Sequence, residues 1–435
     1  MTDHDKRNGT TRRSILRGLG IAGSAIALST GSAAGTPATP SREIERRENL
    51  TYAERPDVDH EDHGDGELQL DLYLPDRRKP HPAPVVVYIH GGQWLYGDKA
   101  DPSEVPMFEH FARRGFAVAS IEYRFATEAT FPAQIRDVNT AIQWLRARAD
   151  DYDLDAENVA TWGTSAGAHL AALAGVTNEV DEFEGDGPST YSSDVQAAVS
   201  WYGIMALDRL RETAHPDSPY EYEHATAPES LLVGENVGEN PEAGQYASPI
   251  EYVDPDDPPL LLYHGNDDHI VGYGQSELLF ERARERCHDT TFYELHGLGH
   301  SSEDVYSALS DTPPAEATAR TAHCKPTDDA LRERVRDGPI ASLTDMERFL
   351  RRNLRHRYPV RRSNRSRGVI SDKIGRKRPK GATRSTVALL VDRQRPVLRL
   401  ELVAEHLLIE LPGRRLRDRL DEDDPVWQPP LREPL

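Results

Sequence analysis

Short apolar runs alternate with helical apolar periods through the middle of the chain, from about residue 66 to residue 300. A run of four or five mostly apolar residues is typical of a strand that is covered on both faces. An earlier run at residues 68–72 alternates leucine with polar residues, which predicts an antiparallel edge strand with one face in water. Five further runs predict buried strands, at residues 85–89, 117–121, 159–162, 197–201 and 260–263.

A helix is predicted between the second and third buried runs, where Pro132 suits the first turn. Four apolar residues then recur at spacings of three and four and form one stripe, namely Ile135, Val138, Ile142 and Leu145. Strands that alternate with helices build a parallel sheet through right-handed crossovers. We therefore predict an α/β fold with a mostly parallel, twisted sheet and helices on both faces.

Residues 203–258 differ from the rest of this region because they hold many Pro, Glu and Tyr residues and little regular period. A connection of this length within a compact domain is usually functional. We expect residues 203–258 to form a partial cover over the site that the strand ends create.

The charge of the chain is unevenly distributed. Its 435 residues include 52 Lys and Arg against 73 Asp and Glu, a net charge of −21. Residues 351–435 hold 22 basic and 11 acidic residues, so residues 1–350 carry −21 − 11 = −32. Only seven of the basic residues are Lys. Salt screens the repulsion between so many carboxylates, so this composition suits a protein that stays soluble at high ionic strength. We expect a halophile's protein; an ordinary acidic secreted enzyme is the alternative.

The C-terminal residues 355–435 reverse this composition, and we expect them to form a basic, disordered tail. A basic arm can bind nucleic acid through charge alone. An exported protein meets little nucleic acid, so we expect no such partner. The tail could instead bind the acidic body, or it could be translated from outside the original reading frame.

The N-terminus has the pattern of an export signal. Arg12 and Arg13 precede a mild apolar run that continues to about Thr30, and small residues follow at residues 32–34. This pattern predicts a twin-arginine signal peptide over residues 1–34, which the export machinery would read and a peptidase remove. Residues 35–65 then read as a linker. An uncleaved anchor is the alternative, and the exported protein could stay at the cell surface.

Export would allow a disulfide between Cys287 and Cys324, the only two cysteines of the chain, although two free thiols are as compatible with the sequence. Their spacing matches no zinc-ligand pattern.

The candidate nucleophile is Ser165, in the segment Gly163-Thr164-Ser165-Ala166-Gly167. This segment follows a predicted strand directly and enters an alanine-rich helix. A nucleophile on a tight strand-to-helix turn needs small neighbours, and both glycines meet that need. The N-terminus of the helix directs free N–H groups and a partial positive charge at a substrate. A plain connector between strand and helix is the other interpretation.

A second motif, His90-Gly91-Gly92-Gln93-Trp94, follows the predicted strand at residues 85–89. Acyl transfer needs backbone donors aimed at the oxygen that becomes negative, and consecutive glycines let backbone N–H groups come close to it. Gly91 and Gly92, together with Ala166, are therefore candidate oxyanion-hole donors. A simple turn after a strand would account for the glycines as well.

A serine nucleophile also needs a base and a carboxylate that orients the base. Asp268 follows the predicted strand at residues 260–263, and we choose it over its neighbour Asp267. His300 lies in a glycine-containing loop after another apolar run, and we favour it over His296, which we assign a structural role. The chain order Ser165, Asp268, His300 is typical of one architecture.

Four segments, at residues 90–94, 121–137, 163–170 and 248–271, together resemble an α/β-hydrolase of the esterase and lipase group. The likeness is close to its feruloyl-esterase-like and kynurenine-formamidase-like branches. It covers residues 66–300 and a closing helix at about residues 343–354, so the predicted domain spans residues 66–354 with an insertion at 301–341. It implies a triad of Ser165, Asp268 and His300 and an oxyanion hole formed by Gly91, Gly92 and Ala166.

The expected function is hydrolysis of a small-molecule carboxylic ester, without a metal or organic cofactor. An amidase or formamidase that acts on an aryl formamide would use the same triad, and a non-catalytic binding protein could share the fold. The sequence does not determine the oligomeric state.

Overall fold

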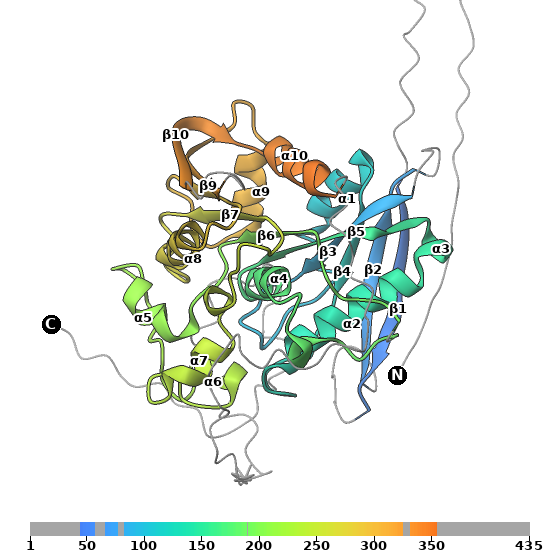
Figure 1. Ribbon diagram of the computed structural model, residues 1–435, viewed down its shortest axis with the longest axis horizontal. Coiled ribbons are helices and arrows are strands. Elements are labelled where there is room, and N and C mark those ends of the chain that lie inside the picture. The colour runs from blue at the N-terminus through green and yellow to red at the C-terminus, as the bar shows by residue number, and fades with distance from the viewer. Residues whose placement is uncertain (1–43, 57–65, 77–81, 189, 325–330, 355–435) are drawn as a thin grey trace, which may run out of the picture. The chain divides into compact units, whose positions relative to one another are not determined.

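The computed structural model describes residues 44–56, 66–76, 82–188, 190–324 and 331–354 (Figure 1). The predicted signal peptide and the predicted basic tail lie outside these residues. None of the described helices is both long enough and apolar enough to span a membrane.

A mixed sheet of ten strands forms the centre of the described chain, in the order β1-β2-β4-β3-β5-β6-β7-β8-β9-β10. The six strands from β4 to β8 in this order run parallel, and the two strands at each end join antiparallel. Their bounds are β1 Glu45–Glu54, β2 Glu67–Leu74, β3 Ala83–Ile89, β4 Ala117–Ile121, β5 Leu154–Thr164, β6 Ala197–Trp201, β7 Leu260–Gly265, β8 Thr290–Leu295, β9 Ala315–Cys324 and β10 Leu331–Ala341.

The five predicted buried runs fall in β3 to β7, and the predicted α/β fold is confirmed. Alternate residues of β3 point to opposite faces of the sheet, as strand geometry requires. Val85 and Val87 pack in one core cluster with α2 (Ala133–Ala147) and α4 (Ala166–Val176). Val86 and Tyr88 pack in a second cluster with α1 (Val105–Arg114). Both faces are therefore covered, which explains why the runs are continuously apolar.

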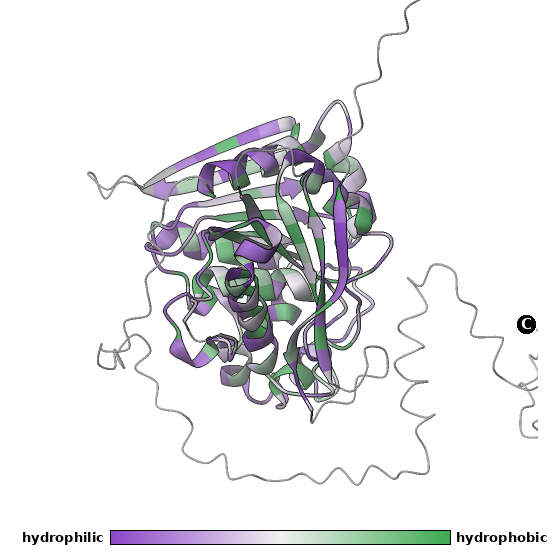
Figure 2. Cartoon of the chain, turned by 90° about the vertical axis from the view of Figure 1, so that its right-hand side faces the viewer, coloured by the Kyte–Doolittle hydropathy of each residue, from purple (hydrophilic) through white to green (hydrophobic). Residues whose placement is uncertain are grey.

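Further helices complete the two layers (Figure 1). The α8 helix (Gly274–Glu285) packs with α4 and β7 in a third core cluster. The α9 helix (Ser302–Ser310) and the closing helix α10 (Leu343–Asn353) join α1 on the opposite face. Figure 2 shows hydrophobic colouring gathered on the central strands and hydrophilic colouring over much of the outside.

The prediction that residues 68–72 form an edge strand is wrong. They lie in β2, which is buried along most of its length and pairs with β4 on one side and β1 on the other. The β1 strand belongs to the segment that we predicted to be a linker. Half of its residues are charged and half are exposed, so only its pairing with β2 reveals it as a strand.

Residues 301–341 contain α9 and the hairpin of β9 and β10, which extends the sheet because β9 pairs with β8. Cys287 is disulfide-bonded; the side chain of Cys324 lies outside the described part. Residues 203–258 form only short helices: η2 (Leu207–Arg209), α5 (Leu210–Thr213), α6 (Pro228–Val233), α7 (Pro241–Tyr246) and η3 (Pro249–Glu251). The remaining short helices are α3 (Ala149–Tyr152) and η1 (Asp181–Phe183).

Candidate active site

Ser165 lies on the sharp turn between β5 and α4. Its backbone angles, φ 53° and ψ −120°, fall in a region that residues with side chains rarely adopt. The turn is possible because Gly163 and Gly167 lie two residues before and after the serine. A Cβ on Gly167 would lie 2.0 Å from the carbonyl oxygen of Ile89, and one on Gly163 would lie 2.3 Å from the carbonyl oxygen of Gly167. The chain thus packs backbone against backbone around the serine.

The structure brings Ser165, His300 and Asp268 together in one hydrogen-bonded chain. The Nε2 atom of His300 lies 2.9 Å from Ser165 Oγ, and its Nδ1 atom lies 2.7 Å from Asp268 Oδ2. These side chains come from the ends of β5 and β7 and from the loop after β8. Parallel strands place their carboxyl ends at one edge of a sheet, which explains how residues 135 positions apart meet.

Asp268 is 1% exposed, and its carboxylate accepts several hydrogen bonds. Its Oδ1 atom accepts from the backbone N–H groups of Ile270 and Val271, at 2.9 and 2.8 Å. Burial by itself would raise the pKa of Asp268, but the charge of His300 and the hydrogen bonds from His264 and His300 outweigh it, and the pKa falls well below its usual range. Asp268 is therefore ionised, and its carboxylate can accept the hydrogen bond from His300 Nδ1.

His264 is a fully buried partner of this carboxylate that the sequence analysis missed. Its Nε2–H group donates to the carbonyl of Val271 at 2.7 Å and lies 3.3 Å from Asp268 Oδ2. The hydroxyl of Ser276 bonds the other ring nitrogen at 2.8 Å. His264 directly follows the predicted strand at residues 260–263, and nothing in the sequence indicates that its imidazole is buried against Asp268.

The two residues that we rejected lie apart from this chain of hydrogen bonds. Asp267 is exposed, and its Oδ1 atom lies 3.2 Å from His269 Nε2. His296 is exposed too, and its Nε2 atom lies 3.1 Å from Thr318 Oγ1 on β9.

The glycines of the second motif lie beside the serine. A Cβ on Gly91 would come within 3.3 Å of Ser165 Cβ, and Gly92 has a φ of +113°. A Cβ on Gly92 would collide with the carbonyl oxygen of Tyr96 at 1.9 Å. Within the described ranges, no carbonyl or side chain accepts from the backbone N–H groups of Gly91, Gly92 or Ala166. These three donors are therefore available to a ligand.

A buried histidine joins the glycine loop to residues 203–258. Trp94 Nε1–H donates to His169 Nδ1 at 3.1 Å, and the opposite ring nitrogen of His169, Nε2, donates to the carbonyl of Ala247 at 2.7 Å. Burial lowers the pKa of His169 to about 4, although the bond to Ala247 acts against this shift. His169 is thus neutral and fixes the loop of residues 90–94 against α4 and residues 203–258.

One group among the described side chains has the composition of a metal site: His215, Asp267 and His269. The two imidazole rings stack face to face, with centroids 3.9 Å apart and an angle of 13° between planes. Parallel rings do not aim their nitrogen lone pairs at a common point, as shared coordination of one ion requires. We therefore assign no ion to this group.

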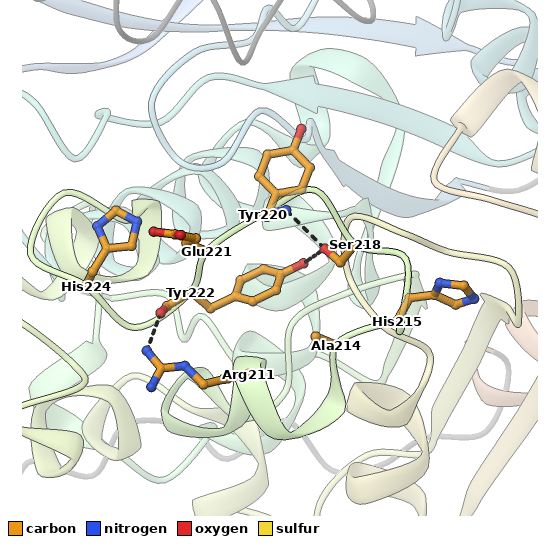
Figure 3. Close-up of a pocket in the computed structure, with 8 residues that line it drawn as sticks. All are labelled: Arg211, Ala214, His215, Ser218, Tyr220, Glu221, Tyr222 and His224. Atoms are coloured by element: carbon orange, nitrogen blue, oxygen red, sulfur yellow. Dashed lines mark hydrogen bonds between the residues drawn. The ribbon is translucent and has the colours of Figure 1, made fainter.

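Residues 203–258 contain a pocket of about 410 Å³. Figure 3 shows that its lining comes from residues 211–224, with Tyr222 reaching across it to Ser218. The Tyr222 hydroxyl lies 2.8 Å from Ser218 Oγ and donates to the carbonyl of Ile270 at 2.7 Å. The pocket therefore adjoins the loop of Asp268, although neither Ser165 nor His300 lines it.

Comparisons with known proteins identify relatives of this chain. The family model described as BD-FAE matches residues 70–283. The chain is 31% identical over 268 residues to a protein named esterase LipC from Mycobacterium tuberculosis, covering 59% of this chain and 62% of that protein. It is 30% identical over 276 residues to a probable carboxylic ester hydrolase, LipM, of the same organism, covering 63% of this chain and 62% of that protein. The match thus spans less than two thirds of either relative.

A solved structure, titled as a truncated form of a carbohydrate esterase from gut microbiota, matches with a TM-score of 0.52 and 31% identity. The match covers 61% of this chain and 91% of that one. The fold and the arrangement of the site define an α/β-hydrolase. With these relatives, the chain belongs to the α/β-hydrolase esterase family, and the predicted resemblance is confirmed.

Proposed function

We propose that this protein is a serine hydrolase that cleaves carboxylic esters through an acyl-enzyme intermediate. The observation that carries the proposal is the hydrogen-bonded chain from Asp268 through His300 to Ser165. A serine hydroxyl becomes a strong nucleophile when a neighbouring base takes its proton. The names of the relatives, which are esterases, favour an ester over an amide as substrate.

In the proposed first half-reaction, His300 Nε2 accepts the hydroxyl proton while Ser165 Oγ attacks the ester carbonyl carbon. The carboxylate of Asp268 holds the ring through Nδ1 and stabilises the positive charge that forms on it. The tetrahedral intermediate collapses when His300 returns the proton to the alkoxide leaving group. An alcohol departs and the acyl group remains on Ser165.

Backbone donors of Gly91, Gly92 and Ala166 would stabilise the negative oxygen of this intermediate. Donors that are fixed in place before the reaction lower its barrier because they need no reorganisation. Ala166 is the first residue of α4, so the positive end of the helix dipole adds to its effect. In the second half-reaction, water repeats the same steps and releases the carboxylic acid.

Labelling with a fluorophosphonate in molar salt, followed by mapping of the modified residue, tests the proposal. Ser165 should carry the label, and Ser165→Ala should reduce turnover of a short p-nitrophenyl ester by at least about 10⁴-fold. Ser310→Ala is a matched control because Ser310 is exposed at the end of α9. A label on another residue, or full activity of Ser165→Ala, would refute the assignment.

A further inference from the structure

A carboxyl group without a cationic partner lies buried behind the nucleophile. Glu104 precedes α1 and is 6% exposed. Its Oε1 atom accepts from the hydroxyl of Tyr88, and Thr164 Oγ1 lies 3.5 Å away. Its Oε2 atom has no hydrogen-bond partner, and no Lys, Arg or His forms an ion pair with it, in the part of the chain that the structure describes.

A row of hydroxyl groups leads from this carboxyl group to residues that lie beside both reacting side chains. Tyr88 Oη lies 3.0 Å from Thr164 Oγ1, and Thr164 directly precedes Ser165. The hydroxyl of Tyr202 interacts with the side chains of Thr164 and Ser302. The ring of Tyr202 also packs on the imidazole of His300, with centroids 4.6 Å apart.

Each of these hydroxyl groups has one proton to donate, which determines the direction of the hydrogen bonds. Tyr88 has one hydroxyl proton and donates it to Glu104, so Thr164 must donate to Tyr88. Thr164 can then only accept from Tyr202. The row of hydroxyls ends at Oε1 of Glu104 as its final acceptor.

We propose that Glu104 is a positioning residue, which in its neutral form aligns Ser165 and His300 through the hydroxyl row of Tyr88, Thr164 and Tyr202. This inference rests on the proposed serine hydrolase. A neutral carboxylic acid offers the carbonyl oxygen that Tyr88 needs and leaves one O–H group unpaired. A carboxylate would instead bury a full negative charge, which costs far more than one unpaired donor.

Burial and a nearby negative charge favour the neutral form of Glu104. Tyr88 on β3, Tyr123 after β4 and Tyr202 after β6 face it with phenol groups, and Asp101 in the preceding loop adds a negative charge. Burial raises the pKa of Glu104 to about 8, since the hydrogen bond from Tyr88 only partly opposes it.

Ionisation of Glu104 should slow catalysis at high pH. Below pH 8 Glu104 is neutral and the row is intact; above pH 8 a buried anion forms beside Thr164. This anion opposes the negative charge that develops on the substrate oxygen next to Ser165, and little solvent screens the repulsion. The rate of acylation should therefore fall as pH rises through about 8. A Ser-His-Asp site alone keeps its activity there, because its base works in the neutral form.

Glu104→Gln is the variant that tests this inference, because glutamine keeps the acceptor for Tyr88 and cannot ionise. We expect wild-type kcat and the rate constant of fluorophosphonate inactivation to fall at least about fivefold between pH 7 and pH 9.5, and those of Glu104→Gln to change less than about twofold. KM should stay the same in both proteins. Circular dichroism at each pH excludes unfolding as the cause.

Glu229→Gln is a matched control. Glu229 is another buried carboxyl, on α6, and burial raises its pKa to about 7, but its Oε1 atom accepts from the backbone of Glu223 and not from the hydroxyl row. Glu229→Gln should keep the alkaline decrease of the wild type. If Glu104→Gln does not fold, Thr164→Val breaks the row without changing shape, and it should lower kcat about tenfold with KM unchanged.

An alkaline decrease that persists in Glu104→Gln, or its absence in the wild type, would overturn the role of Glu104. So would unchanged kcat in Thr164→Val. These results differ from a failure of the proposed function, in which the wild type shows no esterase activity and no label on Ser165 at any pH.

Discussion

Ser165 Oγ and His300 Nε2 lie 2.9 Å apart, yet the segments that carry them are fixed in different ways. The turn at Ser165 is held by backbone contacts that only glycine permits, as Gly167 against Ile89 illustrates. The loops of Asp268 and His300 are held by hydrogen bonds from side chains and backbone N–H groups. Substitution of a glycine at the turn should therefore disturb folding, whereas a substitution in the loops should disturb catalysis first.

Among substitutions in the loops of Asp268 and His300, Asp268→Asn should have the largest effect on kcat. The amide has no charge to stabilise the imidazolium and favours the wrong histidine tautomer, so kcat should fall by about 10³ to 10⁴-fold. Steady-state kinetics on a p-nitrophenyl ester in molar salt measure this fall. The matched control is Asp267→Asn, since Asp267 is exposed and does not contact His300. A larger loss in Asp267→Asn than in Asp268→Asn would reverse the assignment of the acid.

Gly167→Ala tests the backbone packing that holds the turn at Ser165. The added Cβ would lie 2.0 Å from Ile89 O and 2.4 Å from His90 O, and neither backbone atom can move without shifting the sheet. We expect the free energy of unfolding to fall by about 3 kcal/mol or more, measured by urea denaturation.

Gly299→Ala is the control for crowding, because its Cβ would meet only Asp267 O, at an ordinary 3.5 Å. It should change the free energy of unfolding by less than about 1 kcal/mol. Equal stability of Gly167→Ala and Gly299→Ala would contradict the backbone packing that we describe for the turn.

The sequence predicted the turn and the central strands well because both depend on local chemistry. Gly163 and Gly167 lie two residues before and after Ser165, and a strand such as β3 is apolar along its whole length since both its faces are covered. The edge strand β1 escaped prediction because its exposed residues are charged. Pairing with β2, and not its own pattern, makes it a strand.

The supporting side chains of the site could not be predicted for a related reason. Glu104, His169 and His264 are polar residues at positions where the sequence carries no sign of burial. Each becomes buried because residues distant in the chain close over it: Tyr88 over Glu104, and Ala247 over His169. Such contacts form only in the folded protein.

The smallest expected effect is at His264, where a substitution tests whether this side chain aligns Asp268 or only stabilises the fold. His264→Leu removes the donor beside Asp268 Oδ2 and the bond to Val271, and we expect kcat to fall about tenfold with KM unchanged, because the carboxylate can tilt away from His300. His264→Gln should recover part of kcat, since its amide can donate again.

His288 provides the comparison that decides between the two roles. It is as buried as His264 and bonds Thr290 and the carbonyl of Pro258, but it has no contact with the three reacting side chains. Both leucine variants should lose about 1 to 3 kcal/mol of unfolding free energy, because each leaves buried polar groups without partners. Only His264→Leu should also lose kcat at a temperature where both proteins are fully folded. If His288→Leu lost as much kcat, the effect at His264 would be one of general destabilisation, and the loops of the site would not differ from the rest of the core.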